Sequence, residues 1–287
     1  MSHPVIIDTH QHAWDLDRVA YPWLTPDFGP IARTYLPSEL EPQLKLAGVT
    51  ATVMVQSANS YADTEYMFEQ AEQYPWIIGV VGWVPLLYPD VAGRALERYA
   101  RNPRFCGVRH LIHNEANPRW LLQERVIESL KLLAERGLTF DVVATLPEHM
   151  ECIPILSERI PDLRMVIDHL SQPPIPTREL GRWGDDLKAA AANPNVYGKI
   201  SGLGTTTGNW EGWTADDIKP YVHYALATFG ADRCMCGGDW PVSVLAGGYV
   251  KAWTAYRAIL GELTPAEQTA VFSQTALRCY GLQLPAA

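Results

Sequence analysis

The sequence lacks the features that would bring it to a membrane or to nucleic acid. No stretch approaches 18 consecutive apolar residues, so no transmembrane helix is predicted. Basic residues are scarce: the 287 residues hold 23 Lys and Arg against 32 Asp and Glu, a net charge of -9, and no Lys/Arg-rich block occurs. Nucleic acid and anionic membrane surfaces both require a basic footprint. We therefore expect neither as a partner, and a neutral or modestly charged small molecule instead.

Cysteine is also sparse, and no secretory leader is evident. The five cysteines, at positions 106, 152, 234, 236 and 279, are scattered and odd in number, which disfavours a disulfide framework and fits a reducing compartment. Cys234 and Cys236 are expected in the core of a strand rather than in a metal site. Residues 1–4 lead into the first apolar run without a basic or long apolar segment. The sequence thus predicts a soluble, cytoplasmic protein, and it leaves the oligomeric state open.

Short apolar runs alternate with amphipathic stretches along the whole chain. Eight runs are expected to be strands, at residues 5–8, 51–56, 77–84, 106–112, 139–143, 165–168, 196–200 and 234–237. Runs that are apolar throughout are typical of parallel strands buried on both faces. Between them, residues 123–136 show helical spacing, and residues 264–267 have the signature of a helix start. The pattern predicts an α/β fold, a (β/α)8 TIM-type barrel that forms a single domain over residues 1–287.

A His-x-His pair follows the first apolar run. His10 and His12 are two residues apart, so on a strand their imidazoles point to the same face. Asp239 ends the last apolar run, and the carboxyl ends of the first and last strands are neighbours in a parallel barrel. Two imidazoles and a carboxylate are therefore expected to face one cavity. A neutral imidazole can bind a metal ion or form a hydrogen bond with a ligand.

Other polar residues lie where the strands of this barrel would end, which is where barrel active sites are built. They are Arg109, His110 and His113 after the fourth run, Asp168 and His169 after the sixth, and Lys199 and Ser201 after the seventh. Neighbouring residues on a strand face opposite ways, so Arg109 and His113 are favoured over His110 as the inward pair. Arg109 could instead pair with a core carboxylate. Asp168 is expected to point outward and Lys199 to be a structural charge.

Five motifs resemble those of the amidohydrolase superfamily, and within it the branch of sugar-acid and related lactonases. They are DTHQHAWD at residues 8–15, GVR at 107–109, DHL at 168–170, KISG at 199–202 and GDWP at 238–241. They follow the order of the strands and span nearly the whole chain. The resemblance implies a (β/α)8 enzyme of the L-fuconolactonase or L-rhamnonolactonase type, a carboxylic ester hydrolase of carbohydrate metabolism and L-fucose catabolism.

The chain departs from the metal-dependent members of that superfamily. Those typically place a bridging lysine or glutamate on the fourth strand and a histidine on the fifth, whereas here the fourth offers Arg109 and residues 139–143 contain no histidine. A two-metal site is therefore not expected. His10, His12, His169 and Asp239 could hold one zinc ion, but the resembled branch includes members that work without metal. We expect that no cofactor is required, with a single zinc as the alternative.

Aromatic residues near the expected mouth of the barrel are candidates for binding a sugar ring. The predicted substrate-binding residues are Trp14, Trp23, His113, Trp210 and Trp240. Tryptophan suits the apolar face of a sugar, although packing in the core is the alternative for each indole. Residues 172–177 and 202–212 are expected to be long loops over the site.

The residues suggest a mechanism for the chemistry that the resemblance implies. Hydrolysis of a lactone needs a base for water, support for the oxyanion and an acid for the leaving alkoxide. Asp239 is expected to be the base and then the acid. His10, His12, His169 and Arg109 are expected to orient and polarise the carbonyl, through a zinc ion if one binds. No Gly-x-Ser-x-Gly motif occurs, so direct attack by water is predicted.

The resemblance implies L-fuconolactone or a close relative, such as L-galactono- or D-arabinono-lactone, as the substrate. Abundant tryptophan and limited positive charge favour a neutral, polyhydroxylated lactone over an aromatic or dicarboxylate lactone. Two other classes stay open. One is a zinc-dependent amidohydrolase or nonoxidative decarboxylase, and the other is a sugar-acid binding protein without catalysis.

Overall fold

Eight parallel strands form a barrel in the computed structural model, which describes residues 5–284. Each strand pairs with the next one in chain order. The strands are β1 (Ile7–Gln11), β2 (Ala51–Val55), β3 (Ile77–Gly82), β4 (Phe105–His110), β5 (Thr139–Val142), β6 (Arg164–Ile167), β7 (Val196–Ile200) and β8 (Cys234–Cys236). All eight predicted runs are therefore confirmed as strands, and the barrel is confirmed with them. Residues 1–4, on which the expected lack of a leader rests, lie outside the described residues.

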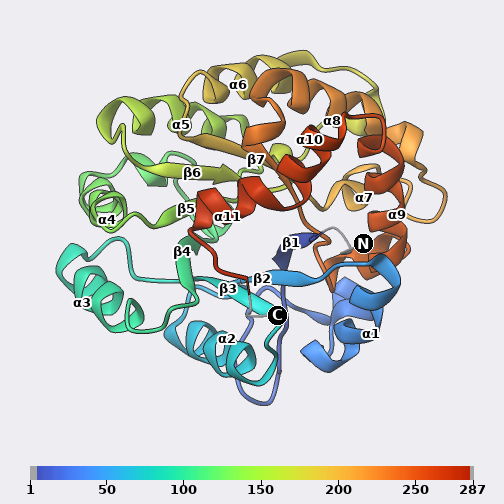
Figure 1. Cartoon of the computed structure of the whole chain (residues 1–287). Coiled ribbons are helices and arrows are strands. Elements are labelled where there is room, and N and C mark those ends of the chain that lie inside the picture. Colours follow the sequence, from blue (N-terminus) through green and yellow to red (C-terminus); the bar gives the residue numbers. More distant parts are fainter. Residues whose placement is uncertain (1–4, 285–287) are drawn as a thin grey trace.

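Helices surround the barrel (Figure 1). They are α1 (Pro37–Ala47), α2 (Tyr61–Gln73), α3 (Pro89–Tyr99), α4 (Glu124–Glu135), α5 (Pro147–Arg159), α6 (Gly181–Ala191), α7 (Leu203–Thr206), α8 (Ala215–Phe229), α9 (Tyr249–Leu260), α10 (Pro265–Thr269) and α11 (Thr275–Tyr280). Within residues 5–284, none of them has the length and apolar character needed to cross a bilayer. The predicted helix at 123–136 is α4, and the capping box of Thr264 with Glu267 starts α10.

Short helical turns connect several of these elements. They are η1 (Pro26–Ile31), η2 (Ile112–Asn114), η3 (Trp120–Leu122), η4 (Asp168–Ser171), η5 (Ile175–Thr177), η6 (Ala231–Arg233), η7 (Val242–Ala246) and the π-helical η8 (Ala270–Gln274). The five cysteines are buried free thiols, as the sequence predicted, and two of them, Cys234 and Cys236, are core residues of β8. Because η2, η4 and η7 follow β4, β6 and β8, they shape the carboxyl end of the barrel.

The barrel closes where the end of β8 meets β1. The Asp239 N–H donates to the His10 carbonyl, and the His12 N–H donates to the Trp240 carbonyl, both at 2.7 Å. Gly237 permits this approach, since a Cβ at that position would lie 2.6 Å from the His10 Cβ. The same backbone contacts that close the barrel therefore bring Asp239 beside the two histidines.

The buried carboxylate of Asp8 also stabilises the closure between β1 and the segment after β8. Asp8 accepts the N–H groups of His10 and Gly238 through Oδ1, both at 2.9 Å, and the Tyr249 hydroxyl through Oδ2 at 2.7 Å. Burial raises the pKa of the Asp8 carboxyl to about 7. One side chain thus ties β1 to the glycines after β8 and to α9.

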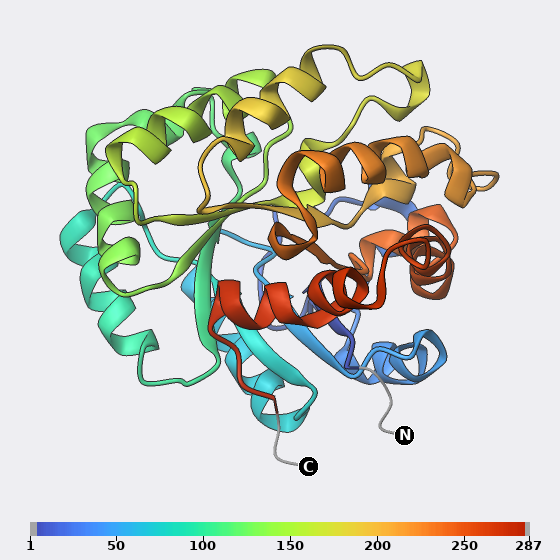
Figure 2. The same ribbon diagram turned by 45° about the horizontal axis from the view of Figure 1, so that its top comes forward.

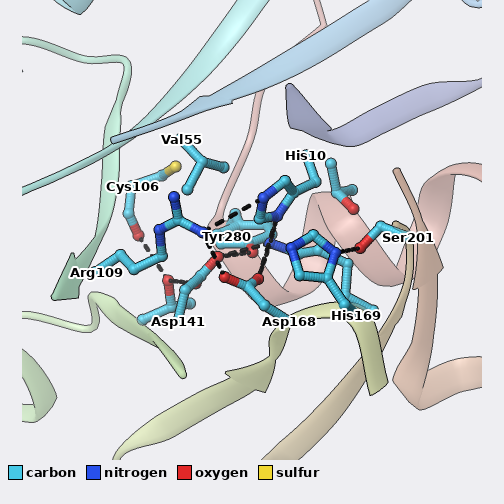
Figure 3. Close-up of polar contacts among 12 residues, drawn as sticks. His10, Val55, Cys106, Arg109, Asp141, Asp168, His169, Ser201 and Tyr280 are labelled. Carbon is cyan, nitrogen blue, oxygen red and sulfur yellow. Dashed lines mark hydrogen bonds and ion pairs between the residues drawn. The ribbon is translucent and has the colours of Figure 1, made fainter. Parts of the chain in front are cut away.

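Charged side chains fill the interior of the barrel (Figure 3). The Lys199 ammonium lies 2.7 Å from Asp141 Oδ2 and 2.9 Å from Asp168 Oδ1, and all three side chains are fully buried. Arg109 pairs with Asp168 at 3.0 Å. Tyr280, on helix α11, donates its hydroxyl to Asp141 at 2.8 Å. Figure 2 shows α11 (red) across one end of the barrel, so the interior is sealed at that end by a helix that takes part in the charge network.

The expectation that Asp168 points outward is wrong. The strand β6 ends at Ile167, and His169 has a positive φ of 53°. The alternation of side chains along a strand therefore stops before Asp168, and both Asp168 and His169 reach the interior. Lys199, expected to be a structural charge, is one of the two cations, with Arg109, that pair with the Asp168 carboxylate there.

We predict that Lys199→Met destabilises the protein by about 3–5 kcal/mol, because it leaves the buried Asp141 carboxylate without a cation and Asp168 with Arg109 alone. The matched control is Arg159→Met, which removes a cation from the exposed pair with Glu124 and should cost about 0–1 kcal/mol. Equilibrium urea unfolding of both variants measures the free energies. Equal losses in the two variants would contradict a stabilising role for the interior charges.

Candidate active site

A cavity of about 360 Å³ opens at the carboxyl ends of the strands. This volume lies within the usual range of small-molecule sites. Six of the predicted site residues line it: His12, Trp23, Arg109, His113, His169 and Asp239. A neighbouring cavity of about 330 Å³ shares Thr145 and Gln172 with it but is lined by none of those six. The first cavity is therefore the candidate active site.

The two histidines at the end of β1 turn their Nε2 atoms toward each other, 3.1 Å apart. His12 Nδ1 lies 2.7 Å from the Val55 carbonyl oxygen. A carbonyl only accepts, so the His12 proton is on Nδ1 and its Nε2 carries a lone pair. His10 Nδ1 lies 3.2 Å from both Lys199 Nζ, a donor, and Asp168 Oδ1, an acceptor. Either tautomer of His10 therefore finds a partner at Nδ1. With its proton on Nε2, His10 also donates to His12 Nε2 and engages that lone pair.

Asp239, on the segment that follows β8, faces this histidine pair. Its Oδ1 lies 3.6 Å from His12 Nε2 and 3.8 Å from His10 Nε2. The residue has a φ of +51°, in the left-handed region that Asp tolerates better than most side chains. Its carbonyl accepts the Ser243 N–H at 2.8 Å. The backbone thus holds the carboxylate in one direction, toward the two imidazoles.

His169 lies beside His10 and Asp239. Its Nδ1 is 2.9 Å from Ser201 Oγ, and its ring centroid is 4.4 Å from that of His10 (Figure 3). Gly202 separates His169 from Asp239: a Cβ there would lie 2.6 Å from His169 Nδ1 and 2.9 Å from Asp239 Oδ2. Gly202 also has a φ of +62°. The close approach of the imidazole and the carboxylate therefore depends on a glycine at this position.

Arg109 lines the cavity, and its guanidinium is paired with the carboxylate of Asp168. Its Nη1 donates to Asp168 at 3.0 Å, and its Nη2 donates to the Gln56 carbonyl oxygen. Burial would raise the pKa of Asp168, but Lys199 and His10 hold it well below its usual value, so the partner carboxylate is ionised. Arg109 is the only arginine or lysine among the described residues that line the cavity. The cavity therefore offers no unpaired cation to an anionic ligand.

Two of the histidines near Asp239, His10 and His169, are neutral at neutral pH. Burial lowers the pKa of His10 well below its usual value, and burial also lowers the pKa of His169. Neutral imidazoles can hold a water molecule, donate to a carbonyl oxygen or bind a metal ion. Beside one carboxylate, they form the groups that proton transfer to and from water requires.

The donor atoms also fit a single metal ion. His10, His12 and Asp239 form a group whose ligand atoms lie within 4.8 Å of one another. Ligands at about 2.1 Å from a tetrahedral zinc ion would be about 3.4 Å apart, close to the spacings of these atoms. His169 belongs to a second group, with His10 and Asp168. Of the four predicted ligands, the structure thus brings three together in one group and places the fourth beside it.

The predicted tryptophan wall is largely absent. Trp23 lines the cavity, with its Nε1 donating to the Ser57 carbonyl at 2.6 Å. Trp14 and Trp240 are only 0% and 1% exposed and pack in the core, where the Trp14 Nε1 donates to the Arg33 carbonyl. Trp210 is 46% exposed and lies outside the cavity wall. None of these three residues borders the cavity, so the structure gives their predicted contact with substrate no support, and that contact stays a prediction.

The structure separates the three polar residues that follow the fourth run. Arg109 and His113 line the cavity, as expected. His110 points away from it: its ring stacks on Trp120 with centroids 4.1 Å apart, and its Nδ1 accepts from Trp83 at 3.0 Å. The alternation along β4 explains why neighbours 109 and 110 diverge.

Several polar cavity residues were missed by the sequence reasoning. They are Ser57, Asn114, Thr145, Gln172, Thr205 and Thr206. Each lies in the segment that follows the carboxyl end of a strand, the position at which barrel sites are built. That position is the only signal the sequence carries for them, because Ser, Thr, Asn and Gln are ordinary loop residues.

Known proteins with similar sequences agree with the fold and the motifs described above. A family profile described as Amidohydrolase matches residues 7–282. A protein named L-fucono-1,5-lactonase from Burkholderia ambifaria is 35% identical over 284 residues, which are 97% of this chain and 96% of that protein. A second protein of that name, from Burkholderia multivorans, is 31% identical over 98% of this chain and 97% of its own.

A crystal structure shares the fold closely. It is an amidohydrolase from Burkholderia multivorans with bound Zn, and its sequence is 31% identical to this chain. The alignment covers 97% of this chain and 100% of that one, with a TM-score of 0.88. The similarity extends over the whole barrel rather than over isolated motifs.

We predict that Gly202→Ala displaces the His169 imidazole and the Asp239 carboxylate, because the added Cβ overlaps both. Gly281→Ala is the matched control, since Gly281 also has a positive φ but has open space around it. Both variants should lose about 1–2 kcal/mol of stability through the left-handed conformation. Only Gly202→Ala should shift the imidazole NMR signals of His169; unchanged signals would refute the proposed packing.

Proposed function

This chain belongs to the amidohydrolase family, and on that premise we propose that it hydrolyses a neutral sugar-acid lactone to the sugar acid. The preferred candidate is L-fuconolactone, because two relatives over 30% identical are named L-fucono-1,5-lactonase. Related hexono- and pentonolactones, such as L-galactono- and D-arabinono-lactone, are the next candidates. A cytoplasmic location and a role in L-fucose catabolism stay predictions.

One observation carries the proposal: a carboxylate faces a lone pair of His12 at the wall of a cavity suited to a small molecule. Asp239 Oδ1 is 3.6 Å from His12 Nε2, which leaves room for both to contact one water molecule. The carboxylate accepts one proton of that water. The His12 lone pair accepts a hydrogen bond from the other when the His10 proton is on Nδ1, facing Asp168, and so leaves that lone pair free. Water held in this way is positioned and activated as a nucleophile.

The attack and the departure use the same carboxylate. Asp239 takes a proton as the water oxygen bonds to the lactone carbonyl carbon, and the carbonyl oxygen becomes an oxyanion. The ester C–O bond then breaks, and protonated Asp239 returns its proton to the departing ring oxygen. This sequence leaves Asp239 ionised and the product with a carboxyl group and a free hydroxyl, so the cycle closes without a covalent enzyme intermediate.

The donors for the oxyanion are His169 and Arg109. When Ser201 donates to His169 Nδ1, the His169 proton lies on Nε2 and is free for the ligand. The Arg109 Nε is buried without a partner among the described residues, and Arg109 lines the cavity. His12 cannot donate to the oxyanion from Nε2, because its proton is engaged by Val55. We therefore assign His12 to the water rather than to the carbonyl.

A single metal ion, when bound, would be held by His10, His12 and Asp239 and would supply Lewis-acid polarisation to the lactone carbonyl or the water. The similar amidohydrolase crystal structure with bound Zn makes such an ion a realistic alternative. Proton transfer by Asp239 accounts for hydrolysis without it, and the two tautomers of His10 suit either state. We keep metal-independent turnover as the proposal.

The charge of the cavity supports a neutral substrate. Arg109 is paired with Asp168, the nearby imidazoles of His10 and His169 are neutral, and Asp239 is an acid residue. A carboxylate on the lactone would be repelled by Asp239, and no unpaired cation would neutralise it. A dicarboxylate lactone is therefore disfavoured relative to a polyhydroxylated one.

We predict that Asp239→Asn lowers kcat on L-fuconolactone by roughly 10²- to 10⁴-fold, because an amide cannot carry the proton. Asp162→Asn, an exposed change of the same type, should leave kcat unchanged. Proton release from the lactone measures turnover, and circular dichroism checks the fold. Substantial activity in Asp239→Asn would remove this residue from the proton transfer.

Chelation tests the metal independence. Protein stripped of metal, with the residual content measured, should still release protons from a panel of L-fucono-, L-rhamnono-, L-galactono- and D-arabinono-lactones. If turnover returns only when Zn²⁺ is added, the histidines and Asp239 form an essential metal site instead. Failure to turn over any lactone in either state would contradict the proposed function itself.

A further inference from the structure

Three successive carbonyl groups at the end of β2 hold three side chains of the cavity. Within residues 55–57, the first carbonyl oxygen accepts from His12 Nδ1 at 2.7 Å, and the third accepts from Trp23 Nε1 at 2.6 Å. The carbonyl between them accepts from Arg109 Nη2. This short segment therefore sets the positions of an imidazole, a guanidinium and an indole at the cavity wall.

The last residue of this segment, Ser57, is itself fixed from behind. Asp63 Oδ2, in the first turn of α2, accepts the N–H of Ser57 at 2.7 Å and the N–H of Ala58 at 3.1 Å. Asp63 is fully buried, and its own N–H donates to the Ser60 hydroxyl that caps the helix. Both backbone polar groups of Ser57 are thus engaged, and its position is defined by two other parts of the chain.

The side-chain hydroxyl of Ser57 is the polar group that remains. Ser57 lines the cavity and is 3% exposed, and its Oγ is buried with no hydrogen-bond partner among the described residues. Buried polar atoms are nearly always paired, because an unpaired one loses its hydration without compensation. Rotation about χ1 can turn a serine hydroxyl toward the cavity that the residue lines, and a polar group of the ligand can then be its partner.

This combination is specific to Ser57. Ser157 and Ser243 also have buried hydroxyls without a partner, but neither lines this cavity. Among the described cavity residues, the other buried side-chain atom without a partner is Arg109 Nε, which can only donate. Ser57 is therefore the one cavity residue whose orphaned group can both donate and accept.

We propose that Ser57 is a specificity-determining residue whose hydroxyl binds one ring hydroxyl of the lactone, on the side of the cavity where residues 55–57 hold His12. The inference rests on the proposed lactone hydrolysis. A sugar hydroxyl both donates and accepts, so it matches the Ser57 hydroxyl in both directions. A lactone that lacks this hydroxyl leaves Ser57 unpaired, and it is disfavoured for that reason.

The test compares Ser57→Ala with the unaltered protein on the lactone that the latter hydrolyses fastest and on its monodeoxy analogues, one for each ring hydroxyl. We expect kcat/KM of Ser57→Ala to fall about tenfold on the parent lactone, the loss of one hydrogen bond to a neutral group. On one deoxy analogue, the two proteins should be equal, because the hydroxyl that Ser57 binds is missing. Ser157→Ala, which removes an orphaned hydroxyl outside the cavity, should match the unaltered protein on every substrate.

The outcomes separate the inference from the function on which it rests. Equal loss by Ser57→Ala on the parent and on all analogues would give Ser57 a merely structural role, and no loss on any of them would also overturn the proposal. Ser57→Cys, which keeps the size with a weaker donor, should recover part of the selectivity if the hydroxyl is what matters. If the unaltered protein hydrolyses no lactone, the proposed function falls, and this role of Ser57 falls with it.

Discussion

The closure of the barrel between β8 and β1 is the constraint on which the site depends. Two backbone hydrogen bonds, from the Asp239 N–H to the His10 carbonyl and from the His12 N–H to the Trp240 carbonyl, join segments at opposite ends of the chain. Gly237 allows the approach, and the buried Asp8 carboxylate secures it by accepting the Gly238 N–H. Because the same contacts complete the sheet and aim the carboxylate, the geometry of Asp239 is coupled to the stability of the fold.

Ion pairs between buried side chains allow the barrel interior next to the cavity to hold several charged groups. The cations of Lys199 and Arg109 neutralise the carboxylates of Asp141 and Asp168, so the floor carries no large net charge. His10 contacts this network through Nδ1, and its Nε2 faces His12 and Asp239. Since both a donor and an acceptor face its Nδ1, His10 can present either a proton or a lone pair to its neighbours. The arrangement suits a water-based reaction and would also accept one metal ion.

Much of the fold could be predicted because parallel strands buried on both faces leave continuous apolar runs in the sequence, and all eight were recognised. The period-2 rule also placed His10 beside His12 and separated Arg109 from His110. It failed at Asp168, where β6 had ended and His169 adopts a positive φ.

The tryptophans could not be placed for another reason: an indole fits the core and a cavity wall equally well, and loop packing decides which. Trp14 and Trp240 pack in the core, whereas Trp23 lines the cavity. Ser57 was missed because its role comes from the partners of its backbone and not from its residue type. Residues whose function depends on contacts between distant loops are invisible to local patterns.

The central claim is that Asp239 activates water and does not itself attack the lactone. The most direct test is a single turnover in H₂¹⁸O with enzyme in excess over lactone. Direct attack by water predicts that one ¹⁸O enters the product carboxylate in this first turnover. If the product carries no ¹⁸O and the label is instead found in the enzyme, an enzyme carboxylate is the nucleophile. Label in the released hydroxyl would place the cleavage at the wrong bond. Either result would contradict the account.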